Sequence, residues 1–108
     1  MDNKYNFEFD LENTVSVYPT YIYISRAVIE MLDGETKVNI GLDIENKVLC
    51  IKKADNDTNK RIYAITQYRT QGIKLIRAIK NITTKTTFKA RYDKDLNMVL
   101  VDLTEGAK

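Results

Sequence analysis

This 108-residue chain contains no histidine, a single cysteine, a single proline and only two serines. Without histidine, it lacks both the commonest general base and the commonest zinc ligand. Its one thiol, Cys50, has no partner for an internal disulfide and no histidine that could activate it as a nucleophile. These absences favour a reducing compartment and give no recognisable catalytic constellation.

Glycine and long apolar runs are also scarce. The four glycines (Gly34, Gly41, Gly72 and Gly106) lie too far apart to form a phosphate-binding loop. The first residues, Met1–Lys4, do not have a basic region followed by an apolar one, and no apolar stretch is long enough to cross a bilayer. We therefore expect no signal peptide, no contact with a membrane and a cytoplasmic location.

Cys50 allows two interpretations. It could be a reactive or redox thiol, or it could be a small core residue. It lies in the apolar run Val48–Ile51, and free cysteine is among the most buried residue types, so the core interpretation is favoured.

Two acidic pairs occupy short polar segments between apolar runs, Asp43 with Glu45 and Asp93 with Asp95. Paired carboxylates can bind a metal or act as acid and base. Aspartate is also favoured in turns, because its side chain accepts hydrogen bonds from nearby backbone N–H groups. The turn interpretation is favoured, so we predict a protein that is not an enzyme, with no catalytic residue, no metal and no cofactor.

The composition is that of one folded domain, residues 1–108. Hydrophobic residues make up 44% of the chain and charged residues 30%, which argues against wholesale disorder. The net charge of +2 is too small to identify a nucleic-acid-binding protein by itself. Lysine outnumbers arginine 12 to 5, and isoleucine and asparagine are frequent, which is typical of AT-rich genomes and suggests a low-GC bacterium or its phage.

The apolar pattern indicates that one structural unit occurs twice, at about residues 21–53 and 61–103. Each copy is predicted to contain a strand, a short helix and a two-stranded hairpin. The helices align when Ser25 is set on Thr70, and the hairpins when Asp43 is set on Asp93. We predict an α+β, strand-rich single domain in which two βαββ pseudo-repeats share one core, with an N-terminal strand at about residues 4–12.

The element boundaries follow from periodicity and from turn residues. Predicted strands cover 21–24, 36–42, 47–53, 62–65, 83–92 and 98–103, with Val15 and Val17 extended up to Pro19. Ser25 and Thr70 should open the two helices, and Gly34 should lie near the end of the first. The second helix should direct Ile73, Ile76 and Ile79 inward. Residues 54–60 should connect the halves, and residues 104–108 should fray.

Basic residues recur around the second copy and near the helix starts. They could contact DNA phosphates, or they could be the solvated side of an amphipathic helix. Duplicated positive patches would suit two DNA half-sites. The candidate nucleic-acid-binding residues are Arg26, Lys52, Lys53, Lys60, Arg61, Arg69, Lys74, Arg77 and Lys80.

Three of the seven tyrosines, Tyr18, Tyr21 and Tyr23, cluster around Pro19. Tyrosine is enriched at protein interfaces, which makes these three candidate protein-interface residues. They could equally be strand residues that pack with one face partly exposed to water.

The first copy resembles the swapped-hairpin unit of AbrB-type (SpoVT/AbrB-like) transition-state regulators. The likeness covers Tyr21–Gly34, Lys37–Asp43 and Lys47–Lys53, about 30 residues, and is weaker in the second copy. In that family two units, normally from two chains, interlock into a barrel that binds DNA. The resemblance implies that this chain could close such a barrel alone.

The chain departs from the family at the first helix. The family usually has a proline where Ser25 stands and an arginine pair where this chain has Ile29 and Glu30. No individual DNA-contact residue is therefore carried over. The overall layout, including the ending Leu96–Leu103, also resembles short uncharacterised proteins of Firmicute phages and prophages.

Two functions follow as expectations. The first is a non-enzymatic AbrB-like DNA-binding regulator borne by a phage or mobile element and acting in transcription regulation. The alternative is a protein–protein inhibitor of a host defence complex, such as an anti-CRISPR-type phage protein. The expected partners are accordingly DNA or a host protein, and the chain could also form a homodimer.

Overall fold

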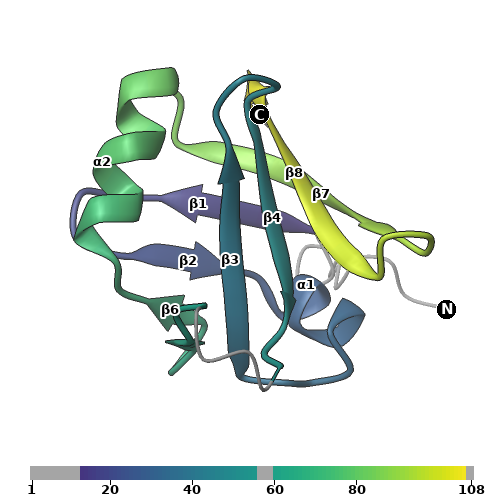
Figure 1. The fold of residues 1–108 in the computed structure, drawn as a ribbon. Coiled ribbons are helices and arrows are strands. Elements are labelled where there is room, and N and C mark those ends of the chain that lie inside the picture. The colour runs from purple at the N-terminus through teal and green to yellow at the C-terminus, as the bar shows by residue number, and fades with distance from the viewer. Residues whose placement is uncertain (1–12, 56–59, 107–108) are drawn as a thin grey trace, which may run out of the picture.

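The computed structural model describes residues 13–55 and 60–106, and the predicted N-terminal strand at residues 4–12 lies outside these ranges. The described chain forms a strand-rich domain with two helices (Figure 1). In chain order the elements are β1 (Thr14–Val17), β2 (Ile22–Ile24), α1 (Arg26–Met31), β3 (Lys37–Asp43), β4 (Val48–Lys53), β5 (Tyr63–Ala64), β6 (Arg69–Thr70), α2 (Ile73–Ile82), β7 (Thr87–Asp93) and β8 (Met98–Gly106).

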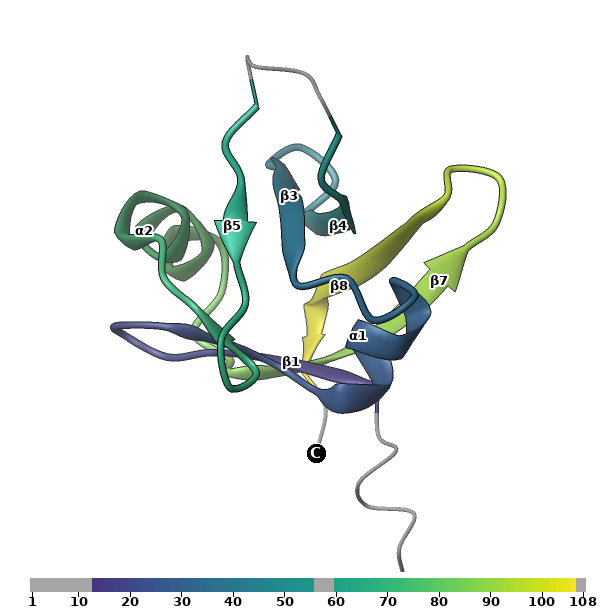
Figure 2. The same ribbon diagram turned by 90° about the horizontal axis from the view of Figure 1, so that it is seen from below.

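All eight strands belong to one antiparallel sheet in the order β5-β3-β4-β8-β7-β1-β2-β6. Its two terminal strands, β5 and β6, follow each other in the chain. The turn between them is held by two backbone hydrogen bonds between Thr66 and Arg69, with N···O distances of 2.8 and 3.0 Å. The two ends of the sheet therefore meet, and the sheet curls into a nearly closed barrel (Figures 1 and 2).

Strand alternation places one apolar row inside the barrel. Val15 and Val17 in β1, and Leu49 and Ile51 in β4, are fully buried, as is Phe88 in β7. Both helices pack against this core, through Val28 of α1 and through Leu75, Ile76 and Ile79 of α2, and they lie apart from each other (Figures 1 and 2). Burial of this apolar surface is the main driving force for folding the domain. Neither helix in the described part of the chain has the length and apolar character needed to span a lipid bilayer.

The first helix begins as predicted but is capped differently. Ser25 occupies the N-cap position of α1, yet its Oγ accepts a hydrogen bond from the backbone N–H of Thr14 in β1, at 3.1 Å, and not from the helix. At the other end, the N–H of Asp33 donates to Glu30 and that of Gly34 to Ile29, each at 3.0 Å. This is the Schellman arrangement, with Asp33 at a φ of 57° and Gly34 at 77°.

The second helix differs from the prediction at its start. Thr70 does not open α2, because it lies in β6, pairs with Ile22 and is buried; Gly72 is the N-cap. Ile76 and Ile79 face inward as predicted, but Ile73 is 59% exposed. Each step of three residues falls about 60° short of a full helical turn, so a row of three isoleucines drifts across the helix surface. Leu75 completes the buried face.

Three further differences concern the strands. Val15 and Val17 belong to a paired strand, β1, and the turn after it contains Pro19, with the N–H of Tyr18 donating to the carbonyl of Tyr21. The short strand β6 was not predicted. Of residues 104–108, which were expected to fray, 104–106 continue β8, where Gly106 pairs with Phe88, and 107–108 lie outside the described residues.

Candidate functional site

The predicted basic residues separate into groups. Arg26 lies exposed at the start of α1, on a different side of the barrel from α2 (Figure 1). Lys53 bonds to the carboxylate of Asp33, whose hydrogen bond and charge raise the pKa of Lys53. Lys52 and Lys60 both contact Asp55, at 2.9 and 3.4 Å. These four cations therefore lie away from α2 or beside a carboxylate.

The other five basic residues lie on or next to α2, and we call them the α2 face. They are Arg61, Arg69, Lys74, Arg77 and Lys80. Four of them are exposed, and Lys80 is half-buried. None of the five takes part in an ion pair with a described carboxylate, that is, one within residues 13–55 or 60–104. The α2 face is therefore a cationic surface without internal neutralisation by the described carboxylates.

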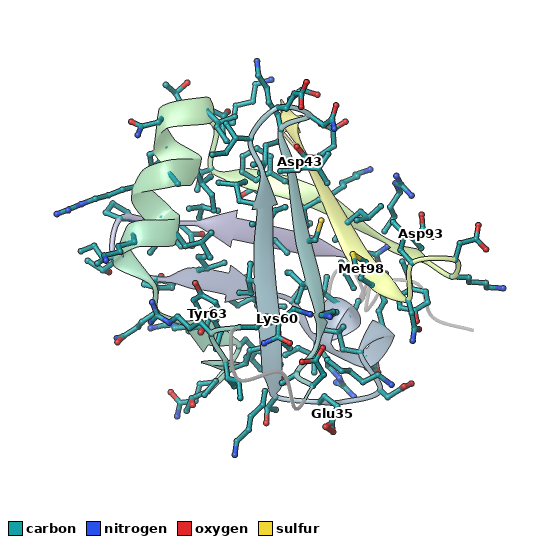
Figure 3. All side chains as sticks on the ribbon, viewed as in Figure 1. Glu35, Asp43, Lys60, Tyr63, Asp93 and Met98 are labelled. Carbon is teal, nitrogen blue, oxygen red and sulfur yellow. The ribbon has the colours of Figure 1, made fainter. Side chains whose placement is uncertain are left out.

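Basic and acidic residues are unevenly distributed along the chain, although their total numbers are nearly equal. The segment from Lys60 to Tyr92 contains nine lysines and arginines and no aspartate or glutamate, whereas the rest of the chain has eight basic and fifteen acidic residues. This segment includes β5, β6, α2 and most of β7. In Figure 3, Asp93 lies at the edge of the molecule opposite α2 and Glu35 at its lower end. This signal was available in the sequence, and the net charge of +2 obscured it.

A groove of about 470 Å³ opens at the foot of α2. Its walls come from β5, β6, the segment entering α2 and the turn before β2, and they include Arg61, Arg69, Tyr21 and Tyr63. The guanidinium carbon of Arg61 lies 4.6 Å from the ring centre of Tyr63, and that of Arg69 lies 4.7 Å from the ring centre of Tyr21. Two cation–π pairs therefore fix the two arginines that line the groove.

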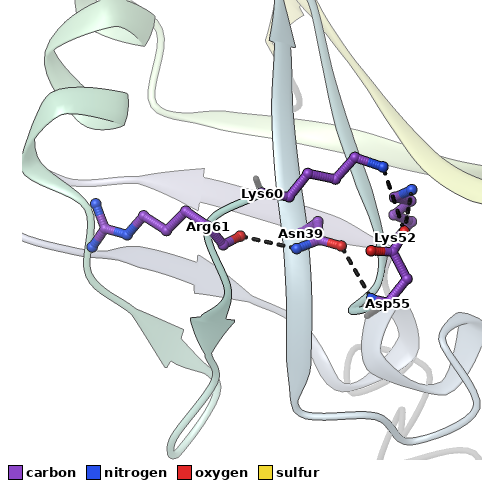
Figure 4. A network of polar contacts seen from close by, with 5 residues as sticks. All are labelled: Asn39, Lys52, Asp55, Lys60 and Arg61. Atoms are coloured by element: carbon purple, nitrogen blue, oxygen red, sulfur yellow. Dashed lines mark hydrogen bonds and ion pairs between the residues drawn. The ribbon is translucent and has the colours of Figure 1, made fainter. Parts of the chain in front are cut away.

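A polar network fixes the backbone of Arg61 (Figure 4). The buried Asn39 donates its Nδ2–H to the Arg61 carbonyl at 2.9 Å, and its Oδ1 accepts from the N–H of Asp55 at 3.3 Å. The side chain of Arg61 extends away from this network, toward the side on which α2 lies (Figure 4). Asn39 therefore attaches both ends of the connector to β3. Sequence reasoning missed this role, since an asparagine in a strand carries no local signal of it.

The three candidate tyrosines lie together around the turn between β1 and β2. The ring centres of Tyr18 and Tyr21 are 4.9 Å apart, and those of Tyr23 and Tyr68 are 6.4 Å apart. Tyr18 is 36% exposed and Tyr68 is 43% exposed, while Tyr21 and Tyr23 are half-buried. The interface and strand interpretations are therefore compatible here, because the rings pack against one another in pairs and remain partly accessible.

The acidic pairs have the contacts that the turn interpretation predicts. Oδ1 of Asp43 accepts from the N–H of Asn46 at 3.0 Å, and Oδ1 of Asp93 accepts from the N–H of Leu96 at 3.0 Å. The hydrogen bonds from Asn46 lower the pKa of Asp43. Both carboxylates are thus engaged in holding their own turns.

Cys50 lies half-buried on the outer face of β4, opposite Gly41 and Leu100, and not in the core as predicted. The strand alternation explains the difference, because Leu49 and Ile51 take the inward positions. Partial burial, followed by the charge of Asp43, raises the pKa of the Cys50 thiol. A raised pKa disfavours the nucleophilic thiolate.

Comparison with known protein families, curated proteins and solved structures finds no match for this chain. What can be argued about its function therefore comes from its own residues and their geometry.

Proposed function

We propose that this protein is a non-enzymatic DNA-binding regulator that folds as a duplicated AbrB-like swapped-hairpin barrel and contacts DNA through the α2 face. The observation that carries the proposal is a group of five basic side chains, four exposed and one half-buried, on α2 and the segments leading to it, in a stretch of sequence with no acidic residue. Such a surface can replace the counterions around DNA phosphates without first breaking internal ion pairs.

The strand pairing supports the duplication. The strands that enter the helices pair with each other (β2 with β6), as do the last strands of the two hairpins (β4 with β8). The first strand of each half pairs with a hairpin strand of the other half: β1 with β7, and β5 with β3. The repeated unit would then be ββαββ and would begin one strand earlier than the sequence pattern indicated. Interleaving of this kind is what the resemblance to swapped-hairpin regulators implies.

Individual contacts repeat as well. The N–H of Val17 donates to Thr86 at 2.8 Å, and in the other half the N–H of Ile65 donates to Thr36 at 2.7 Å. Lys47 and Asn97, which are fifty positions apart, end the two hairpin turns with φ values of 58° and 57°. Matching backbone details at matching positions support one ancestral unit used twice.

DNA binding is tested by fluorescence anisotropy with generic and AT-rich duplexes between about 50 and 200 mM salt. Five phosphate contacts predict a slope of log K against log salt of about −4.5. Replacing Lys74, Arg77 and Lys80 by alanine should weaken binding to both duplexes and reduce the slope by about three. This loss is expected because each removed cation leaves one phosphate with its counterion.

The matched control is Lys94→Ala, which removes one exposed cation from the β7–β8 turn next to Asp93 and Asp95. It should change neither the affinity nor the slope beyond the small effect of net charge. Absence of binding by the unaltered protein at about 50 mM salt would contradict the proposal. An equal effect of Lys94→Ala and of a single α2 substitution would also contradict the assignment to this face.

A second function is favoured by the partly exposed tyrosines: inhibition of a host protein complex. Tyr18 and Tyr68 present aromatic area at the surface, and such residues are often interface anchors. In this case the protein would capture a stoichiometric partner from host lysate, and Tyr18→Ala with Tyr68→Ala would abolish that capture. Failure to recover any partner would count against this function.

A further inference from the structure

The groove at the foot of α2 has the size and the lining of a binding site for a small anionic group. Its volume of about 470 Å³ falls in the range of ligand sites, roughly 300–1,000 Å³. Around Arg61 and Arg69 the walls carry the neutral polar side chains of Thr20, Thr66, Thr70 and Gln71, and none of the lining residues within the described part of the chain is acidic. Two cations thus face a polar groove to which the described residues contribute no carboxylate.

Both arginines are positioned before any ligand arrives. Arg61 lies on the ring of Tyr63, and that ring packs against Gly72, where an added Cβ would lie 2.8 Å from its Cε2 atom. The carbonyl of Arg61 is held by Asn39 (Figure 4). Arg69 lies on the ring of Tyr21, and its backbone is fixed by the pairing of β6 with β2. Preorganisation of this kind lowers the entropic cost of binding.

A cation–π contact uses none of the N–H donors of a guanidinium. The guanidinium carbons of Arg61 and Arg69 each lie over a tyrosine ring, and the N–H groups of a guanidinium form a planar fork of donors. This planar fork matches two oxygens of a phosphate, which a lysine ammonium can contact only as a point charge. Threonine hydroxyls and the Gln71 amide can supply further donors to the same oxygens.

We propose that the Arg61–Arg69 groove binds a phosphoryl group. Two sources share this chemistry: a backbone phosphate of DNA, which would anchor the duplex beside α2 and rests on the proposed function, or a free phosphate monoester acting as a small ligand. The proposal deepens the DNA-binding assignment in the first case and is independent of it in the second.

The test compares inorganic phosphate, adenosine 5′-monophosphate and adenosine by isothermal titration calorimetry at low salt, together with the duplex used for anisotropy. The variants are Arg61→Lys and Arg69→Lys, which keep the charge and remove the fork, with Lys94→Ala as the control. Thermal melting of each variant verifies the fold. Loss of one bidentate contact should weaken binding about tenfold or more.

Each outcome decides between the alternatives. Binding of the monophosphate but not of adenosine, weakened in both lysine variants, identifies a free phosphate monoester as ligand, even if the duplex does not bind. Weaker duplex binding in both variants, with no binding of the free probes, identifies a DNA backbone phosphate. If neither the probes nor the duplex distinguishes the variants from Lys94→Ala, the groove proposal is overturned, while duplex binding through Lys74, Arg77 and Lys80 would still support the proposed function.

Discussion

Gly72, at the N-terminus of α2, allows the ring of Tyr63 in β5 to pack closely against it because it has no side chain. The ring of Tyr63 occupies the space in which a Cβ would lie, and the same ring carries the guanidinium of Arg61. The φ of Gly72 is 177°, an extended value open to any residue, so the constraint is steric and not conformational. One glycine thus positions a core aromatic ring and, through it, one wall of the groove.

We expect Gly72→Ala to destabilise the fold by about 1–3 kcal/mol, the usual effect of overpacking. Gly41→Ala is the matched control, because an added Cβ there meets nothing within 4 Å. It should leave stability unchanged or slightly higher, since alanine restricts the unfolded chain. Urea denaturation measures both, and equal stability of the two variants would contradict the packing role of Gly72.

Residue-level features were predictable where local chemistry decides them. Asp43 and Asp93 hold their own turns through bonds to residues three positions away, a distance within the reach of sequence analysis. The oxygen of Ser25 and the amide of Asn39 bond to residues brought close only by the fold. No local pattern could therefore identify their partners.

At the scale of elements, the two hairpins share one turn design. Both turns begin with an aspartate whose side chain caps the turn, and both end with a residue in the left-handed region, Lys47 in one and Asn97 in the other. Asparagine tolerates this conformation better than lysine, for which it costs roughly 1–2 kcal/mol. The β3–β4 turn is therefore the more strained of the two.

Exchange of the two residues tests this difference. Lys47→Asn should stabilise the protein by about 0.5–1 kcal/mol by relieving the left-handed lysine. Asn97→Lys should destabilise it by more than that, because it also removes the acceptor of the hydrogen bond from the Tyr92 hydroxyl. The midpoints of chemical denaturation report both changes, and a loss of stability in Lys47→Asn would refute the strain argument.

Elements with several alternating residues were predicted close to their observed bounds, as for β3 and β4. The two-residue strands β5 and β6 were predicted with extra residues or missed, because two residues cannot display a period. These strands are nevertheless the ones that bring the ends of the sheet together and form the groove. The predicted site residues Arg61 and Arg69 were thus identified without any indication that they share a groove.

At the scale of the molecule, neither half completes its own sheet. Residues 13–55 supply β1 to β4 and residues 60–106 supply β5 to β8, yet four of the strand pairings join one half to the other. Buried residues such as Val15, Ile51 and Val99 come from both halves and belong to one core. Folding of either half alone would leave this apolar surface and several strand edges in water.

We therefore expect two fragments, cut between Asp55 and Lys60, to be unfolded separately and to fold when mixed in equal amounts. Amide NMR spectra of each fragment and of the mixture measure this. Dispersed signals from one fragment alone would contradict the interleaved core. The intact chain under the same conditions is the control.

The sequence by itself determined where the longer strands such as β3 and β4 lie, where the hairpins turn and which stretch of the chain is free of acidic residues. These properties depend on the order of neighbouring side chains, and a single chain displays them directly. Only the tertiary structure decided which strands pair, that the sheet closes at β5 and β6, and that Arg61 and Arg69 line one groove. A period of two tells which face of a strand is buried but not what lies beside it, because pairing depends on backbone hydrogen bonds that every strand can offer.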